Sequence, residues 1–268
     1  MTSAMAGATV SEEGNNESIY NNPAGLTEIN DFYLYAGNTK LYGFDFLSLY
    51  NLSSYLPMKN FGTIGIGLQQ LETKHNEYTL SKEQTISLSH GLTIQKDNNS
   101  HLALGYTTNF IQWDLGRSSG ITGDGSDGIN IGSLNTITFD VGILASLRNK
   151  YRFGVLIKNF SSSAIGKNVN RFIITQKLKV GLTYKPTNTL STNLCVENIL
   201  GHENSQIQAA IKYNLNKLIT IFTGIQSNPN RFGIGTSFTI WNNNSLSYGL
   251  LTHPVLPITH QFNIGFSI

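Results

Sequence analysis

Charged side chains at strand-like positions are the first candidates for chemistry in this chain. Five of them fall on five consecutive segments that alternate apolar and polar residues, each at a polar position: Asp140, Lys158, Lys179, Glu197 and Lys212. If these segments form a barrel, the five charges face its lumen, where a charge is tolerated when it meets water or an opposite charge. The set could form a polar conduit, an anchor for a segment inside the barrel, or a ladder of salt bridges that fills the lumen.

Metal-binding and nucleophilic residues form no recognisable motif. The histidines lie at positions 75, 90, 101, 202, 253 and 260, with no HExxH pattern and no close ligand spacing. The single cysteine, Cys195, excludes an internal disulfide and a cysteine metal cluster. The segment Gly123–Gly128 suits either a calcium-binding turn or a plain flexible loop. No serine lies in a Gly-x-Ser-x-Gly elbow, so we predict no metal, no cofactor and no catalytic residues.

The composition favours an outer-membrane or secreted β-protein over a nucleic-acid-binding or ordinary cytosolic domain. Charged residues make up 13% of the 268 residues, against roughly 25% in soluble domains. The mean hydropathy is nevertheless −0.12, because Asn, Ser, Thr and Gly fill the polar positions. The net charge is +2, and no basic run is interleaved with aromatic residues, so we expect no nucleic-acid partner.

The elements that would carry these residues are strands. No apolar run approaches the roughly 20 residues that a spanning helix needs. The last stretch, 258–268, alternates instead: Phe262, Ile264, Phe266 and Ile268 are separated by Asn263, Gly265 and Ser267. A period of two residues indicates a strand with one apolar and one polar face. In a membrane barrel the apolar face meets lipid and the polar face meets the lumen.

Fourteen strand-like segments follow residue 30. Their average spacing fits membrane strands of roughly 9–11 residues plus a connection. The segments are Asp31–Ala36, Leu41–Leu49, Phe61–Leu71, Gln84–Ile94, His101–Trp113, Asn135–Leu147, Tyr151–Phe160, Phe172–Tyr184, Leu190–Ile199, Gln206–Tyr213, Leu218–Gln226, Phe232–Trp241, Ser245–Leu251 and Ile258–Ile268. Aromatic residues near their ends suit interfacial girdles: Trp113, Tyr151, Phe160, Tyr184, Tyr213 and Trp241.

The connections between the segments alternate in length. Short ones are 96–100, 148–150, 186–188, 215–217 and 242–244, and longer ones are 72–83, 116–132 and 161–171. Transmembrane barrels have short turns at one end and long loops at the other. An even number of strands then places both termini on the short-turn, periplasmic side. The start, Met1–Gly7, lacks the features of a signal peptide, and we expect the numbering to begin after a removed export signal.

The first 30 residues, called the N-terminal segment below, do not have a strand pattern. They read AMAGATVSEEGNNESIYNNPAGL over positions 4–26: small residues, an acidic patch, and then a turn signal. This pattern resembles the FadL-like outer-membrane proteins and is closest to their PorV/PorQ-like branch. The resemblance implies that the segment folds inside the barrel as a hatch. Its motif residues are Asn21, Asn22, Pro23, Ala24, Gly25 and Leu26; the alternative reading is a tight turn before the first strand.

The resemblance continues in the second half of the chain, through RFGVLIKNF, LKVGLTYKP, IQAAIKYNL and the last twenty residues. His260 matches a histidine before the terminal strand of that branch. The PorV/PorQ-like branch is associated with type IX secretion. The resemblance therefore implies a non-enzymatic subunit of an envelope machine, for secretion and surface attachment or for outer-membrane protein assembly. Its partners would be outer-membrane lipid and other outer-membrane or periplasmic proteins.

Two further functions remain open. FadL-like passage of a hydrophobic solute would use the hatch, although the loops are short for a ligand funnel. An outer-membrane enzyme would need a triad assembled in space. The fold prediction is an all-β protein: a 14-stranded antiparallel outer-membrane barrel over residues 31–268, with residues 1–30 as the hatch in its lumen.

Overall fold

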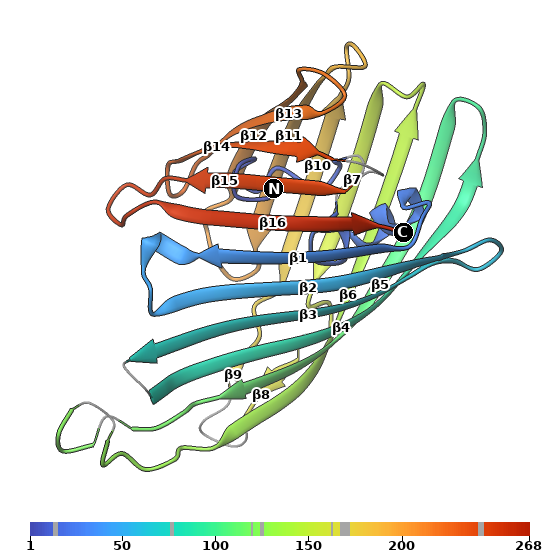
Figure 1. Cartoon of the computed structure of the whole chain (residues 1–268). Helices are drawn as coiled ribbons and strands as arrows, with labels where there is room; N and C mark the ends of the chain where they lie inside the picture. The colour runs from blue at the N-terminus through green and yellow to red at the C-terminus, as the bar shows by residue number, and fades with distance from the viewer. Residues whose placement is uncertain are drawn as a thin grey trace.

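The computed structural model describes residues 1–12, 16–75, 78–118, 120–123, 126–161, 163–166, 172–240 and 244–268, without the side chains of residues 75, 78 and 172. The predicted fold is confirmed: fourteen antiparallel strands close into one barrel (Figure 1). They are β1 (Tyr33–Lys40), β2 (Leu47–Met58), β3 (Gly62–His75), β4 (Tyr78–Lys96), β5 (Ser100–Asp114), β6 (Ser133–Leu147), β7 (Tyr151–Lys158), β10 (Lys177–Tyr184), β11 (Leu190–Ile199), β12 (Gln206–Asn214), β13 (Ile219–Gln226), β14 (Arg231–Thr239), β15 (Ser245–Leu251) and β16 (Thr259–Ser267).

Smaller elements complete the described part of the chain. They are α1 (Ser18–Asn21), the 3-10 helices η1 (Pro23–Glu28) and η2 (Leu41–Gly43), and a two-stranded hairpin of β8 (Ala164–Ile165) and β9 (Phe172–Ile173). Within the described residues, no helix combines the length and the hydropathy needed to cross a membrane.

The barrel closes through the strand predicted from the C-terminal sequence. β16 pairs with β15 on one side and with β1 on the other, in a register that joins Tyr33 to Ser267 and Lys40 to His260. Because β1 and β16 are the first and last strands of the barrel, this pairing leaves no open edge between them. The aromatic residues Phe262 and Phe266 point outward and are 50% and 45% exposed.

The alternation of each strand decides which side chains face out. On β14, Phe232, Ile234 and Phe238 are exposed on the outer wall, whereas Gly233 between them is buried on the inner one. The ambiguous segment 218–226 resolves in the same way. Ile221 and Ile225 are exposed, and Phe222 is buried in the lumen with 6% exposure. Apolar residues therefore cover the outside, as expected for a wall that faces lipid.

Several predicted boundaries were wrong. The second strand spans Leu47–Met58 rather than Leu41–Leu49, because 41–43 forms η2, in which Tyr42 has a positive φ. The eighth barrel strand begins at Lys177 rather than at Phe172, because residues 172–173 pair with β8 instead of the wall. Within 72–83, predicted to be a long link, β3 and β4 continue as a paired hairpin, with only residues 76–77 between their ends.

The two ends of the barrel differ. One end of the barrel holds the start of β1 and the end of β16. The same end carries the β2–β3, β4–β5, β6–β7, β10–β11 and β12–β13 turns. At the other end β3 to β6 continue as long strands, visible at the lower left of Figure 1. Among the predicted girdle residues, Trp113 faces inward and donates to Ser81 from its indole nitrogen, and Trp241 lies outside the described residues.

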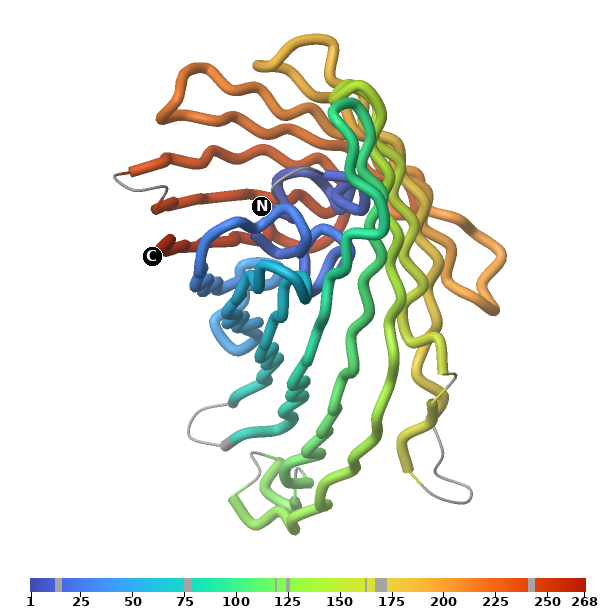
Figure 2. The backbone as a smooth tube through the Cα atoms, turned by 90° about the vertical axis from the view of Figure 1, so that its right-hand side faces the viewer, coloured from blue at the N-terminus to red at the C-terminus, as the bar shows by residue number. Residues whose placement is uncertain are grey.

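Most of the fully buried apolar side chains belong to the N-terminal segment or contact it. Ala4, Met5, Ala8 and Val10 are each at most 1% exposed and cluster with inward-facing residues of the wall. Figure 2 shows this part of the chain folded back within the curve of the strands. The outward apolar residues of the strands face lipid and therefore form no core. The core of this protein lies instead between the inner wall and the N-terminal segment.

Candidate functional site

Local sequence fixes the conformation of the hatch motif. Asn22 has an extended backbone and its side-chain oxygen accepts a hydrogen bond from the Ala24 amide at 3.1 Å. Pro23 follows at the first position of η1, where a missing N–H costs nothing. This is the usual chemistry of a helix start. The predicted turn at residues 21–26 is therefore a short α-helical turn followed by a 3-10 helix, and its residues 22–26 are buried.

The motif lies against the inner wall of β4, β5 and β6, at three glycines. A Cβ atom on Gly105 would lie 2.2 Å from the Ala24 nitrogen, and one on Gly142 would lie 2.1 Å from the Asn22 carboxamide oxygen. A Cβ on Gly91 would meet Leu26 at 2.8 Å. The absence of a side chain at these positions is what allows the motif to approach the wall.

The same relation extends around the barrel. Seven further inward glycines, on six other strands, face the N-terminal segment so closely that an added Cβ would fall within 3.2 Å of it. They are Gly67, Gly154, Gly181, Gly224, Gly233, Gly235 and Gly249. Together with Gly91, Gly105 and Gly142 they are called the glycine girdle below. The inner wall therefore carries no side chain at these positions, where the N-terminal segment comes closest to it.

Acidic residues of the N-terminal segment meet basic and amide groups of the wall. Lys212 donates from Nζ to Glu12 Oε1 at 2.8 Å, and Asn193 donates from Nδ2 to the other carboxylate oxygen at 2.8 Å. Ser11 and Thr183 share a hydrogen bond of 2.7 Å beside them. Lys212 was predicted to be a lumen charge, and its partner lies on the N-terminal segment.

A second ion pair was missed from the sequence. Arg152 on β7 is 4% exposed, pairs through Nη2 with Glu28, and donates from Nε to the Ser11 carbonyl at 3.1 Å. Arg152 shares its alternation phase with Lys158 on the same strand, which was the available signal that it faces the lumen. The partner could not be found in this way, because Glu28 lies 124 residues away.

Glu17 forms the third acidic contact. It accepts hydrogen bonds from Tyr35 on β1 and from Gln261 on β16, the latter at 3.0 Å. Burial alone would raise the pKa of Glu17, but the Met1 ammonium and the hydrogen bonds from Thr2 and Tyr35 lower it to about 2. The carboxylate is therefore charged at neutral pH.

Tyr20 extends from α1 over the inner face of β2 and β3. Its hydroxyl lies 2.9 Å from the Leu52 carbonyl and 3.1 Å from the Leu68 carbonyl. Burial and the nearby Glu17 charge raise the pKa of Tyr20. The hydroxyl consequently stays protonated and is available as a donor to these carbonyls.

The other predicted lumen charges lie on the inner wall of neighbouring strands. Lys179 and Lys177 contact Glu197 at 2.7 Å and 3.5 Å between Nζ and the carboxylate oxygens. Asp140 is 4% exposed and accepts hydrogen bonds from the Asn109 side chain and the Asn159 amide. Lys158 ends β7, opposite Lys177 on β10. These side chains form two groups: one at Glu12 and Lys212, and one around Glu197 toward the long-loop end.

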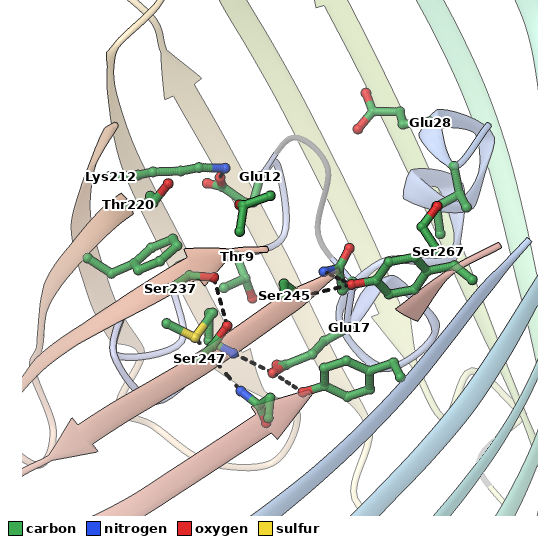
Figure 3. A pocket seen from close by; sticks show the side chains of 18 of the residues that line it. Thr9, Glu12, Glu17, Glu28, Lys212, Thr220, Ser237, Ser245, Ser247 and Ser267 are labelled. Carbon is green, nitrogen blue, oxygen red and sulfur yellow. Dashed lines mark hydrogen bonds and ion pairs between the residues drawn. The ribbon is translucent and has the colours of Figure 1, made fainter. Parts of the chain in front are cut away.

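A cavity of about 370 Å³ remains between the N-terminal segment and the wall of β12 to β16 and β1 (Figure 3). Its wall is mainly hydroxyl side chains, including Ser237, Ser245 and Ser247, with Met5 and Phe222 as apolar contributions. The acidic residues 12, 17 and 28 border it on the other side. This combination could hold water or a small molecule with both apolar and hydrogen-bonding parts.

Other candidates from the sequence do not join this cavity. Cys195 is 1% exposed in the apolar cluster with Met5. Residues 124–125 of the Gly123–Gly128 loop lie outside the described residues, and Asp127 accepts bonds from Ile121 and Thr122. His260 bonds to Tyr248 at 2.7 Å. Among the described residues no group of three or more His, Cys, Asp and Glu has a geometry that could hold a metal ion.

No protein-family model matches the chain, and no curated protein matches it in sequence. Solved structures with a similar fold include the CymD monoaromatic hydrocarbon channel, with a TM-score of 0.69 and 11% identity over 100% of this chain and 96% of that one. The Pseudomonas putida toluene transporter TodX has a TM-score of 0.67 and 11% identity, over 100% and 98% of the two chains. A Pseudomonas aeruginosa FadL homologue has a TM-score of 0.60 and 10% identity, over 98% and 96%.

The chain has the fold of the FadL-like barrels. The coarser resemblance predicted from the sequence is therefore confirmed at the level of fold. At these identities the likeness concerns fold alone, and the finer PorV/PorQ-like resemblance enters only as a proposal. The match covers 96% of the CymD chain and 98% of the TodX chain.

Proposed function

We propose that this protein lets small, largely apolar molecules pass the outer membrane. The observation that carries the proposal is the match of the whole chain to two proteins described as a monoaromatic hydrocarbon channel and a toluene transporter. The match covers 96% and 98% of those two chains. This was the alternative function considered from the sequence, and it now has more support than the machine-subunit reading.

In this proposal the N-terminal segment is the hatch that a solute must pass. The cavity of about 370 Å³ offers a partial route beside it, because Met5 and Phe222 give it an apolar side. The hydroxyl-rich wall opposite would be the solute's exit toward water at the short-turn end. The protein would be an integral, non-enzymatic outer-membrane protein with both termini in the periplasm.

Uptake by proteoliposomes tests this function. Vesicles that contain the full chain should accumulate radiolabelled toluene, or a fluorescent monoaromatic analogue, faster than vesicles with a barrel of unrelated fold. Phe222→Trp, which fills the cavity, should slow uptake several-fold. A matched lipid-facing change, Phe238→Trp, should leave uptake unchanged. Equal uptake by protein-containing and protein-free vesicles would reject the transport function.

A second candidate is a closed subunit of an envelope machine, for type IX secretion or for outer-membrane protein assembly. It is favoured by the close fit of the N-terminal segment, which ion pairs and the glycine girdle hold against most of the wall. Such a barrel needs a sealed centre rather than a conducting one. Its partners would bind the outer wall or the loops.

Planar bilayer recordings separate the two candidates. The intact protein should pass little or no ionic current in either case, whereas deletion of residues 1–20 should produce stable conductance because the remaining lumen wall is polar. Retention of protein partners in mild detergent, both before and after that deletion, together with no solute uptake, would favour the machine subunit. Solute uptake without retained partners would favour the channel.

A further inference from the structure

The short turns carry an excess of positive charge. The β2–β3, β4–β5, β6–β7, β10–β11 and β12–β13 turns contain or adjoin six cationic side chains: Lys59, Lys96, Arg148, Lys150, Lys185 and Lys217. The one carboxylate in these turns is Asp97, whose Oδ2 accepts bonds from Gln95 and Ser100. At the long-loop end the charges are mixed, with pairs such as Lys40 with Asp45 and Lys74 with Glu72.

Backbone hydrogen bonds bring three of these turns together. The Arg148 amide donates to the Asn99 carbonyl, which links the β6–β7 turn to the β4–β5 turn. The Lys185 amide donates to the Lys150 carbonyl at 2.8 Å, which links the β6–β7 turn to the β10–β11 turn. Residues 148 and 149 have positive φ angles, so this turn is tight. Cations from three turns are therefore held side by side at one sector of the barrel rim.

A groove of about 310 Å³ lies directly beside these turns; its lining combines outward-facing apolar residues with the inward-facing His101, Ser146 and Arg152. Its apolar lining comes from strands that face lipid: Leu102, Leu147, Phe153 and Leu182 are 36%, 52%, 46% and 48% exposed. Polar residues Gln95 and Ser100 line the groove at the turn end. The groove thus changes from apolar to polar along the direction in which a membrane changes from acyl chains to headgroups.

We propose that this groove and its cationic rim form a binding site for an anionic glycerophospholipid. An acyl chain would lie in the groove along Leu102, Phe153 and Leu182. The lipid phosphate would meet Lys96, Arg148 and Lys150, which are exposed just beyond the apolar wall. A polybasic cluster at the membrane surface attracts anionic lipid in this way. The combination of apolar groove and cations favours a lipid over an acidic protein, which would need only the cations. The site is independent of the transport function proposed above.

Native mass spectrometry of the full chain in detergent tests the site. The protein is mixed with phosphatidylglycerol and phosphatidylcholine that have the same acyl chains. Phosphatidylglycerol should be retained preferentially. The triple change Lys96→Gln, Arg148→Gln, Lys150→Gln should weaken its binding by roughly ten- to hundredfold. The matched change at the other end of the barrel, Lys74→Gln, Lys82→Gln, Arg117→Gln, should not alter it.

Two further variants keep the test independent of folding defects. The charge-conserving change Lys96→Arg, Arg148→Lys, Lys150→Arg should retain the lipid, and Leu182→Trp, which fills the groove, should release it without changing the charge. Equal retention of the two lipids by the intact protein would overturn the proposal. Displacement of phosphatidylglycerol by lipopolysaccharide at equal concentration would also overturn it. So would a triple Gln variant that kept its lipid selectivity but lost a protein partner, because the cations would then bind a protein.

Discussion

At the scale of single residues, the position of a side chain along its strand decides which solvent it meets. Adjacent residues on β14 illustrate this: Ile234 is 46% exposed on the outer wall, and Gly235 faces Ala4 of the N-terminal segment. A charge on the first would enter lipid, whereas a side chain on the second would enter the barrel core. The effect of a substitution here depends on its phase in the alternation more than on its chemical type.

Ile234→Lys should lower the free energy of unfolding by about 2–4 kcal/mol, because an ammonium group at mid-membrane depth loses its hydration. Ser237→Lys, on the same strand and lining the cavity, should cost much less. Urea titration of the protein folded into lipid vesicles measures both. Equal costs would place the two residues on the same side of the wall. Gly235→Ser should also be destabilising although it faces inward, since its Cβ would lie 2.6 Å from the Ala4 Cβ.

The glycine girdle makes a prediction of the same kind. A Cβ on Gly154 would lie 2.3 Å from the Val10 carbonyl oxygen, so Gly154→Val should displace the N-terminal segment and destabilise the protein by about 3 kcal/mol. Elastase, which cleaves after small apolar residues such as Ala8 and Val10, should then cut within residues 1–12 faster than in the unchanged protein. The neighbouring lipid-facing change Val155→Leu is the control and should leave the cleavage rate as it is.

At the scale of elements, the N-terminal segment and the wall are joined by buried charges. The Arg152 and Glu28 side chains are only 5% and 13% exposed, unlike the exposed pair of Lys40 and Asp45. A buried pair is costly to break because the remaining charge keeps no partner of opposite sign. These contacts therefore decide how firmly η1 is held against β7.

Glu28→Gln should destabilise the protein by about 3–5 kcal/mol, since it leaves the Arg152 guanidinium buried without a carboxylate. Asp45→Asn, which breaks the exposed pair, should cost about 0–1 kcal/mol. Chemical unfolding followed by tryptophan fluorescence measures both variants. The double change Glu28→Gln, Arg152→Met should recover part of the loss; no recovery would mean that the two side chains do not interact.

At the scale of the whole molecule, the asymmetry of the two ends predicts the orientation in the membrane. The long strands β3 to β6 project at one end, whereas β1 starts and β16 ends at the other (Figure 1). In bacterial barrels the longer loops face outward. The basic short turns would then meet the periplasmic leaflet, which is where anionic phospholipid would be available to the groove proposed above.

Cysteine labelling of whole cells tests this orientation. Single cysteines at Ser126 and Ser163, in the Cys195→Ser background, should react with an impermeant maleimide, because both lie in the long loops. A cysteine at Asn149, exposed in a short turn, should not react. Asn243, in the predicted short connection 242–244, lies outside the described residues. Labelling at Asn149 but not at Ser126 would invert the topology.

The sequence by itself determined the barrel. Alternation along one strand is a local property, and it identified fourteen segments and the outward face of residues such as Ile234 and Phe262 without any knowledge of neighbours. Boundaries were less certain because local patterns do not mark where pairing stops. In 72–83, polar residues read as a loop, yet β3 and β4 stay paired there beyond the apolar wall.

Only the tertiary structure decided what fills the lumen. The sequence placed Lys212 at an inner position but not beside Glu12, 200 residues away, and it gave no reason to connect Gly154 with Val10. These contacts exist because barrel closure brings β1 beside β16 and turns every inner face toward one axis, where the N-terminal segment lies. Partners across that axis are fixed by the three-dimensional path of the chain, and no spacing within one strand encodes them.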